Sequence, residues 1–208
     1  MFTLVSWNIQ YGKGVDGRID LGRIAQTVHK DGLPDVLCLQ EVSRNYPSTD
    51  EGADQVKELE NFFPDYESFF GAVHDRSGGK EKTRKQFGNL VLTRLSPVQV
   101  LHHLLPSPAD PKARFMSRQI AELVIPANTT ELRVMTTHLE FFSEIQQFAQ
   151  IQRIREIHEE ASCQFHFPGK DMPDTPFELV KRPENTVICG DFNFTPDSTS
   201  YRKMTSRF

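Results

Sequence analysis

The sequence predicts one mixed α/β domain in which helices cover a largely β core. Two observations predict this fold class. Strand-like apolar runs alternate with helical periodicity in the first third of the chain, and further strand-like runs cluster in its middle. No stretch of the 208 residues is typical of a linker, a repeat or a low-complexity tract. A single domain spanning residues 1–208 is therefore the simplest interpretation.

The first half of the chain shows a strand–helix–strand order, followed by a second helix and two more strands. A helix is expected from Asp20, because apolar residues recur there at helical spacing and Asp20 can cap the first turn. Pro64 ends the next helix. The expected strands are residues 2–7, 35–40, 66–73 and 89–95, the expected helices residues 20–28 and 53–62, and the expected loops residues 11–17 and 75–85.

The second half combines strands with the longest segment of the chain that shows helical periodicity. Apolar residues from Ile145 to Ile157 recur at helical spacing, which predicts a helix over residues 143–161. A short helix is expected near Ser198, with Asp197 as its N-cap. The remaining expected elements are strands at residues 98–105, 118–125, 132–137 and 186–189 and a proline-containing loop at residues 167–183.

Composition limits the class of protein. The formal net charge of −4 argues against a protein that coats nucleic acid through bulk charge, although a local basic patch remains compatible with it. No apolar run approaches the roughly 20 residues of a membrane span, and the N-terminus lacks signal-peptide features, so the cytoplasm is the default expectation. Cys38 and Cys189 lie inside apolar runs, where free thiols usually pack as small hydrophobic groups.

Four of the apolar runs end on a polar residue that can address a metal or a phosphate. These residues are Asn8, Glu41, His138 and Asp191. Glu41 suits Mg²⁺, which takes one or two carboxylates and completes its shell with water and phosphate oxygens. The alternative is a strand-end carboxylate paired with a nearby Lys or Arg.

Asp191 is followed two residues later by Asn193. Side chains at that spacing on extended backbone point the same way, so the two are expected to address one water or phosphate together. A simple turn is the alternative. A charged His138 would donate to a phosphate oxygen, whereas a lone His is more often structural. Asn8 would fix the carboxylate or a phosphate oxygen.

Taken in order, these segments resemble the endonuclease/exonuclease/phosphatase superfamily of metal-dependent phosphoesterases. The resemblance extends from residue 2 to about residue 201. It rests on the segments SWNIQ at 6–10, PDVLCLQEV at 34–42, FGNLVLTR at 87–94, TTHL at 136–139 and GDFNFTP at 190–196.

The resemblance implies a four-layer α/β sandwich, in which helices flank two packed mixed β-sheets. It also implies roles for matching positions. Glu41 is the principal ligand of Mg²⁺, or of Mn²⁺, with Asn8 beside it. Asp191 and Asn193 handle the attacking water and the phosphate, His138 contacts the phosphate, and Asn89 is an accessory residue near the substrate.

Such proteins normally continue beyond the Asp-x-Asn segment into further strands and finish with an Asp-His pair. No such pair follows Asn193 in this sequence. The domain is therefore expected to be C-terminally incomplete and to lack its C-terminal strands. An edge left unpaired in this way would be open to association with other chains.

The predicted function is a Mg²⁺-dependent phosphodiesterase or nuclease. The alternative is a non-catalytic phosphate- or nucleic-acid-binding protein that keeps the fold. No aromatic residue directly precedes Gly190-Asp191, which argues against an inositol-polyphosphate phosphatase, but DNA, RNA and small phosphodiesters remain open as substrates, as does the oligomeric state.

Two segments are candidates for substrate contact. The basic segment Arg76, Lys80, Lys82, Arg84 and Lys85 would steer a nucleic acid or another polyanion if it folds towards the site; a solvated loop is the alternative. Phe115, Met116 and Arg118 would line a substrate groove, with ordinary core and strand-edge packing as the alternative.

Overall fold

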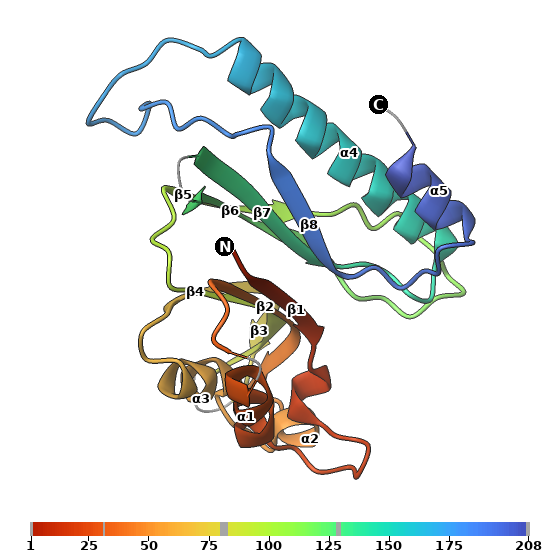
Figure 1. Ribbon diagram of the computed structural model, residues 1–208. Helices are drawn as coiled ribbons and strands as arrows, with labels where there is room; N and C mark the ends of the chain where they lie inside the picture. Colours follow the sequence, from red (N-terminus) through yellow and green to blue (C-terminus); the bar gives the residue numbers. More distant parts are fainter. Residues whose placement is uncertain (1, 31, 80–82, 128–129, 207–208) are drawn as a thin grey trace. The chain divides into compact units, whose positions relative to one another are not determined.

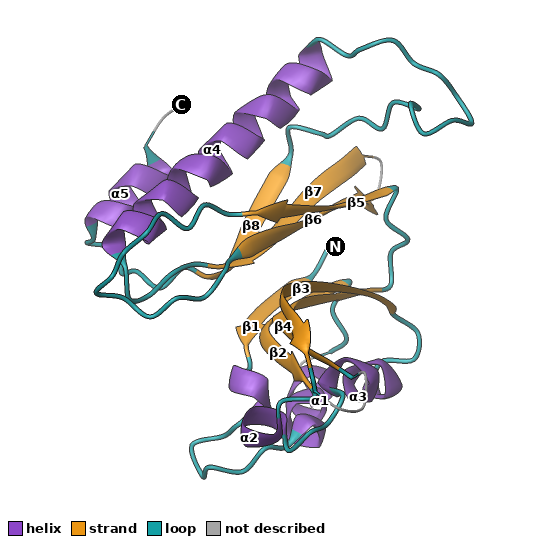
Figure 2. Cartoon of the chain, turned by 180° about the vertical axis from the view of Figure 1, so that it is seen from behind, coloured by secondary structure: helices purple, strands orange, loops and turns teal. Residues whose placement is uncertain are grey.

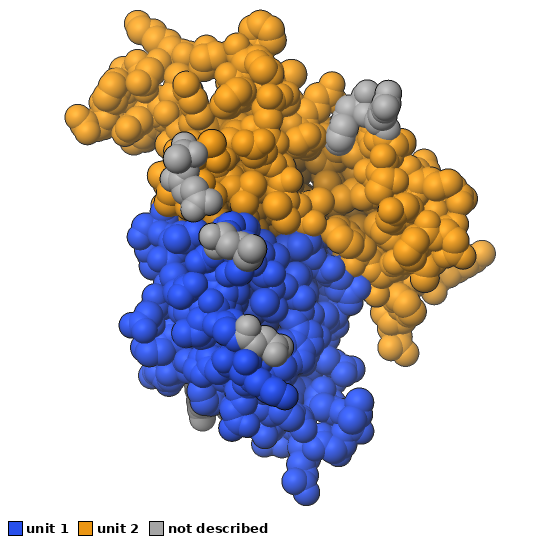
Figure 3. Space-filling view, in the orientation of Figure 1, with its two compact units in different colours: residues 1–96, 136–138, 189–191 blue, residues 97–135, 139–188, 192–208 orange. Residues whose placement is uncertain are grey.

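The computed structural model describes residues 2–30, 32–79, 83–127 and 130–206. The chain separates into two compact units (Figure 3). The first comprises residues 1–96, 136–138 and 189–191, and the second comprises residues 97–135, 139–188 and 192–208. Each unit is built on one four-stranded β-sheet. That the two units form a single domain stays a prediction.

The first unit contains a mixed sheet with β1 (Leu4–Asn8) at one edge. β1 pairs in parallel with β2 (Val36–Arg44), as a strand–helix–strand connection requires. β2 pairs antiparallel with β4 (Arg84–Thr93), and β4 pairs antiparallel with β3 (Glu67–Ser77). The sheet order is therefore β1-β2-β4-β3.

Helices α1 (Leu21–Lys30) and α3 (Gln55–Phe62) cover the same face of this sheet (Figure 1). Asp20 accepts a hydrogen bond from the N–H of Arg23 at 2.9 Å, which confirms it as the cap of α1. The buried core includes Leu21, Ile24, Val28, Leu59 and Phe63 from this layer and Leu37, Leu39, Leu90 and Leu92 from the sheet.

The second unit contains β5, β6, the larger part of β7 and the first half of β8, with two helices along this sheet (Figures 1 and 2); the last three residues of β7 and of β8 belong to the first unit. Ile151, Ile154 and Ile157 of the long helix pack with Ile120 and Met135 of the sheet, which explains the strong helical period in the sequence. The elements are β5 (Gln99–Leu104), β6 (Gln119–Ala127), β7 (Thr130–His138), α4 (Glu144–His166), β8 (Thr186–Asp191) and α5 (Thr199–Thr205).

The predicted fold class is confirmed as α/β, with helices beside two sheets, but some local predictions are wrong. The basic residues 75–85 are not all loop, because β3 extends to Ser77 and β4 begins at Arg84. The N-cap of α5 is Ser198, whose hydroxyl accepts the N–H of Tyr201, and Asp197 instead accepts the Thr195 hydroxyl. The short elements η1 (Gln10–Gly12) and α2 (Pro47–Asp50) were not predicted from the sequence.

Among the described residues, no helix combines the length and the apolar character that crossing a membrane requires.

Candidate active site

The side-chain amide of Asn8 joins the two carboxylates predicted for the site. Asn8 ends β1 and lies opposite Gln40 in the parallel pairing with β2. Its Nδ2 donates hydrogen bonds to Glu41 Oε1 at 2.9 Å and to Asp191 Oδ2 at 2.8 Å. Its Oδ1 accepts the N–H of Gln10 at 3.0 Å, which fixes the amide with its donor side towards the carboxylates. One amide therefore brings together strand ends 183 positions apart in the sequence.

Glu41 lies in a β-bulge. β2 pairs with β4 in one register up to Leu39 and in another from Val42. Glu41 has a φ of +61°, a left-handed conformation that residues other than glycine rarely adopt. Such a conformation costs roughly 1–3 kcal/mol, and bulges beside active sites re-aim side chains. Here the bulge releases Glu41 from the buried run, so that 21% of its side chain is exposed.

His138 ends β7 and lies near both carboxylates. Its Nδ1 is 3.9 Å from Glu41 Oε1, and its Nε2 is 3.8 Å from Asp191 Oδ2. These distances suit an ion pair when the ring is protonated but are too long for direct hydrogen bonds. The structure thus brings together four of the predicted residues, Asn8, Glu41, His138 and Asp191, and all four belong to the first unit.

A glycine is required directly before Asp191. Gly190 has a φ of +136°, and a Cβ built on it would overlap the carbonyl oxygen of Thr137. Only glycine therefore allows the end of β8 to approach the end of β7 this closely. This approach sets Asp191 beside His138, the residue after Thr137.

Asn193 lies outside the strand, which corrects the geometry expected for the Asp-x-Asn pair. β8 ends at Asp191, and Asn193 has a left-handed φ of +52°. The extended spacing that would point both side chains the same way is therefore wrong at this pair. The Asn193 amide donates to the carbonyl oxygen of Leu139 at 2.9 Å, within the second unit. Its role towards water or phosphate stays a prediction.

Asn89 lies in β4 next to the bulge of β2. Its neighbours Gly88 and Leu90 pair with Val42 and Leu39, the two residues that bound the bulge. Only 4% of Asn89 is exposed. A Cβ on Gly88 would overlap the carbonyl oxygen of Gly71, so glycine is needed where β4 closely approaches β3. The next residue, Asn89, then places a polar side chain at the bulge. Its accessory role stays a prediction.

Arg118, predicted to contact substrate, is buried in the second unit. Only 4% of it is exposed, and its Nε lies 3.4 Å from Glu140 Oε2. The alternative of strand-edge packing therefore describes its surroundings better than an open groove does. Phe115 is 60% exposed, and Met116 is half-buried. Substrate contact by these residues stays a prediction.

The basic segment is partly neutralised by its neighbours. Arg84 Nε lies 2.6 Å from Asp75 Oδ1, and the ammonium of Lys85 lies 5.9 Å from the centre of the Tyr46 ring. Arg76 is exposed. Lys80 and Lys82 lie outside the described residues. The described part therefore forms a basic end of the β3–β4 hairpin, with one of its charges in an ion pair.

Gln40 is a buried polar residue that was predicted only as part of a strand. It is 1% exposed, and its Nε2 lies 3.0 Å from Thr136 Oγ1 and 3.2 Å from the carbonyl oxygen of Cys38. It thereby connects β2, next to Glu41, with the end of β7, near His138. The one available signal was an amide at the end of an otherwise apolar run.

The cysteines near the site are free thiols. A hydrogen bond with Cys189 and complete burial raise the pKa of the Cys38 thiol well above its ordinary value. The thiolate of Cys38 is therefore disfavoured, in agreement with a structural role.

The oxygen donors suit a hard divalent cation. Glu41 and Asp191 keep 21% and 31% of their side chains exposed, and the Asn8 amide donates a hydrogen bond to each carboxylate. Mg²⁺ characteristically uses one or two carboxylates and retains several waters, so this donor chemistry fits it. Within the described ranges, no group of three or more His, Cys, Asp and Glu side chains is arranged to hold a metal ion.

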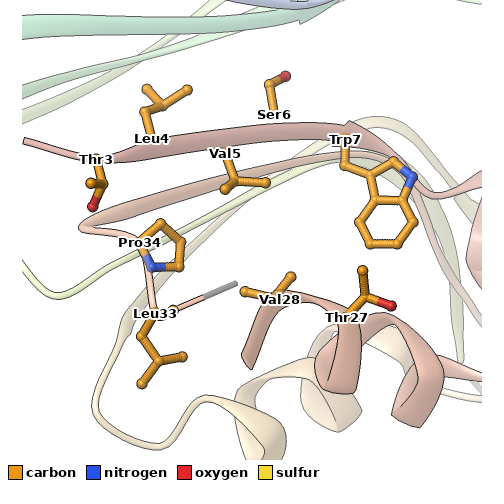
Figure 4. A pocket seen from close by; sticks show the side chains of 10 residues that line it. Thr3, Leu4, Val5, Ser6, Trp7, Thr27, Val28, Leu33 and Pro34 are labelled. Atoms are coloured by element: carbon orange, nitrogen blue, oxygen red, sulfur yellow. The ribbon is translucent and has the colours of Figure 1, made fainter. Parts of the chain in front are cut away.

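A pocket of about 550 Å³ lies beside β1 in the same unit (Figure 4). Thr3, Val5 and Trp7 point towards α1, whereas Leu4 and Ser6 point to the opposite side of the strand. Residues 3–7, 27, 28 and 32–34 line the pocket. It is therefore distinct from the polar cluster, and pocket size alone would not locate the candidate site.

Comparison with known proteins identifies a family-level match. The model of the endonuclease/exonuclease/phosphatase family matches residues 5–208, across both units. No curated protein matches the sequence.

Solved structures share the fold at low sequence identity. An endonuclease/exonuclease/phosphatase from Beutenbergia cavernae has a TM-score of 0.61 and 21% identity, over 86% of this chain and 50% of that chain. A mannosyl-6-phosphatase from Bacteroides thetaiotaomicron has a TM-score of 0.65 and 18% identity, over 99% and 70%. TDP2 from Caenorhabditis elegans has a TM-score of 0.55 and 20% identity, over 94% and 49%. The chain thus spans from about half to 70% of the length of these structures.

Proposed function

The chain belongs to the endonuclease/exonuclease/phosphatase family, and on this premise we propose that it is a Mg²⁺-dependent phosphoester hydrolase acting on a phosphodiester. One observation carries the proposal. The Asn8 amide bonds to both Glu41 and Asp191, and the imidazole of His138 lies within 4 Å of both carboxylates. Carboxylates, an amide and an imidazole at strand ends provide the proton acceptors and the hydrogen-bond donors that phosphoryl transfer requires.

Each of these side chains has a proposed role. Asp191 accepts a proton from a water whose oxygen bonds to phosphorus opposite the ester oxygen. The phosphorus–oxygen ester bond breaks, and the ester oxygen departs with the bonding electrons as an alkoxide or phenolate that solvent protonates. Protonated His138 donates to a non-bridging phosphate oxygen and stabilises the negative charge that develops there. Asn8 holds both carboxylates in place, and Asn193 and Asn89 hold water or substrate.

Glu41, with Asp191 and Asn8 beside it, would hold the Mg²⁺, and Mn²⁺ has compatible ligand chemistry. When bound, the cation supplies positive charge that offsets the charge of the phosphate and of the departing oxygen.

The test is hydrolysis of bis(p-nitrophenyl) phosphate by the 208-residue chain with Mg²⁺ or Mn²⁺. EDTA should abolish turnover, and restoring the cation should recover it. Glu41→Gln and Asp191→Asn should each lower kcat by at least about 100-fold, because the first removes a charge that would hold the cation and the second removes the proton acceptor, a role that contributes roughly 10²- to 10⁴-fold. Absence of turnover with either cation, or turnover that EDTA leaves intact, would contradict the proposal.

Glu67→Gln is the matched control. Glu67 is an exposed carboxylate at the start of β3 in the same sheet, and it accepts a hydrogen bond from the Ser96 hydroxyl. Its replacement should leave kcat unchanged. Comparing p-nitrophenyl phosphate with the diester separates a monoesterase from the proposed diesterase. Tight phosphate binding without turnover would favour the alternative of a non-catalytic binding protein.

A further inference from the structure

The first two turns of α4 bury three glutamine side chains. Gln146 is 2% exposed, Gln147 is 8% exposed and Gln150 is fully buried. A buried amide without hydrogen bonds costs free energy, and apolar residues are the ordinary choice on the inner face of a helix. The later turns of α4 follow that rule with Ile151, Ile154 and Ile157. The hydrogen-bond partners of these three amides therefore need to be identified.

Gln147 connects the segment after His138 with the segment after Asp191. Its Nε2 lies 2.7 Å from the carbonyl oxygen of Glu140 and 3.1 Å from the carbonyl oxygen of Asn193. Its Oε1 accepts the hydroxyl of Ser200 in α5. All of these residues belong to the second unit. One side chain thus fixes two loops, each of which begins one residue after a candidate catalytic side chain.

Other bonds tie the same two loops together. The Asn193 amide donates to the carbonyl oxygen of Leu139, and the Glu140 N–H donates to Gln150 Oε1 at 2.9 Å. The Glu140 carboxylate accepts the N–H groups of Phe141 and Phe142 at 3.0 and 2.8 Å. Glu140 is 1% exposed and pairs with Arg118, so the loop after His138 is rigidly supported from within.

The loop after Asp191 needs such support. Asn193 has a left-handed φ of +52°, a conformation that persists only where its surroundings enforce it. Gln147 bonds to the carbonyl oxygen of this residue, and Leu139 accepts from its side chain. Removing the Gln147 amide would therefore free the backbone at the point where the chain leaves Asp191.

We propose that Gln147 is a positioning residue, which sets the two segments that carry His138 and Asp191 in register for phosphoester hydrolysis. This inference rests on the proposed function. Gln147 touches neither substrate nor reacting atoms. Because a displacement of about 1 Å can lower a rate by about 100-fold, loss of its bonds should reduce kcat more than it changes KM.

The experiment compares Gln147→Leu with Gln146→Leu in bis(p-nitrophenyl) phosphate hydrolysis with Mg²⁺. Gln146 is an apt control because it is also buried on the same helix, and its amide donates to the carbonyl oxygen of Pro108, in a loop that bears no candidate catalytic residue. Gln147→Leu should lower kcat by about 10- to 100-fold with KM changed less than about threefold. Gln146→Leu should keep the wild-type kcat when activity is measured at a temperature at which this variant is folded. Equal losses in both variants, or an undiminished kcat in Gln147→Leu, would overturn the positioning role.

Gln147→Glu keeps the inference testable if the leucine variant does not fold. An ionised carboxylate cannot donate to the carbonyl oxygens of Glu140 and Asn193, whereas its protonated form can. The ratio of variant to wild-type kcat should therefore rise as the pH falls, and a ratio that stays flat would count against the proposal. A wild type without turnover would refute the proposed function itself. An active wild type with unaffected Gln147 variants would refute only the positioning role.

Discussion

Two groups of charged side chains in this protein are built in opposite ways. In the first unit, Glu41 and Asp191 keep 21% and 31% of their side chains exposed, and the neutral amide of Asn8 lies between them. In the second unit, Glu122 is completely buried, and Arg182 meets it with two hydrogen bonds of 2.8 Å. The first group keeps its carboxylates available to a ligand, whereas the second uses its carboxylate entirely within the protein.

The surroundings of Glu122 explain this difference. Burial raises the pKa of Glu122, but hydrogen bonds from His103 and Arg182 and the positive charges of Arg182 and Arg133 outweigh it and lower the pKa to about 2. Arg133 is also fully buried, and burial lowers the pKa of its guanidinium although the charge of Glu122 opposes that shift. The ion pairs of Glu122 with Arg133 and Arg182 therefore have a structural role. Removing Glu122 should affect folding before it affects catalysis.

The sharpest way to break this comparison is to remove each carboxylate in turn. Glu122→Gln leaves Arg133 and Arg182 buried without their counter-charge, which should lower the free energy of unfolding by about 3–5 kcal/mol. Glu41→Gln should leave that free energy within about 1 kcal/mol of wild type while lowering kcat at least about 100-fold. Urea unfolding and diester hydrolysis on both variants measure the two effects. Similar losses of stability in the two variants would contradict the division into a site and a structural pair.

The pH dependence of stability provides a second test. Glu122 has a lower pKa in the folded protein than its ordinary value of 4.5, so the unfolded chain binds the proton more readily. The stability that Glu122 contributes is therefore present above about pH 4.5 and is lost as the pH falls towards 2. A shift of this size corresponds to about 3 kcal/mol.

The measurement is the difference in unfolding free energy between wild type and Glu122→Gln at pH 6 and at successively lower pH. The difference should shrink as the pH falls, because protonation removes the same charge in wild type. A difference that stays constant between pH 4.5 and a lower pH at which both proteins still fold would mean that the pKa of Glu122 is not lowered.

A third prediction concerns the backbone that delivers Asp191. Gly190→Ala would force a Cβ against the carbonyl oxygen of Thr137 in a backbone conformation with φ of +136°. The change should cost roughly 2 kcal/mol or more and should lower kcat as well, because β8 must shift away from β7 next to the site. Gly169→Ala is the control, since nothing lies within 4 Å of a Cβ at that position. Thermal unfolding of both variants would show the contrast, and equal melting temperatures would argue against a close strand approach at Gly190.

The site residues were predictable where a strand ends, and less so where the backbone is irregular. Asn8, His138 and Asp191 are the last residues of β1, β7 and β8, so an apolar run followed by a polar residue located them. The bulge at Glu41 was not predictable, because it depends on how β2 and β4 pair along their length. The left-handed conformation of Asn193 likewise depends on contacts with Leu139 and Gln147.

Buried polar residues were the main features that sequence reasoning missed. Gln40 and Gln147 have ordinary polar side chains, and nothing in local sequence shows that both are buried and hydrogen-bonded to distant segments, Gln40 to Thr136 and Gln147 to Asn193. Glu122 and Arg133 lie inside strands predicted from their apolar neighbours alone. Their partners come from other elements, and single-sequence periodicity cannot pair residues across elements. The longer helices α1 and α4 were predicted, since each carries its signal within a few turns, whereas the short helix α2 was not.

The smallest effect should come from charges that are neither buried nor in the site. Arg153 on α4 pairs with Glu156 and Glu160, yet 32% of the Arg153 side chain and 45–47% of the two glutamate side chains are exposed. The hydrogen bond with Glu160 raises the pKa of Arg153, but solvent screening limits what the pairs contribute to folding. Arg153→Gln should therefore lower the free energy of unfolding by at most about 1 kcal/mol and leave kcat unchanged. Unfolding in urea at low and high salt checks this, because an exposed pair should contribute even less at high salt. A loss as large as that of Glu122→Gln would mean that burial is not what separates strong from weak charge pairs in this protein.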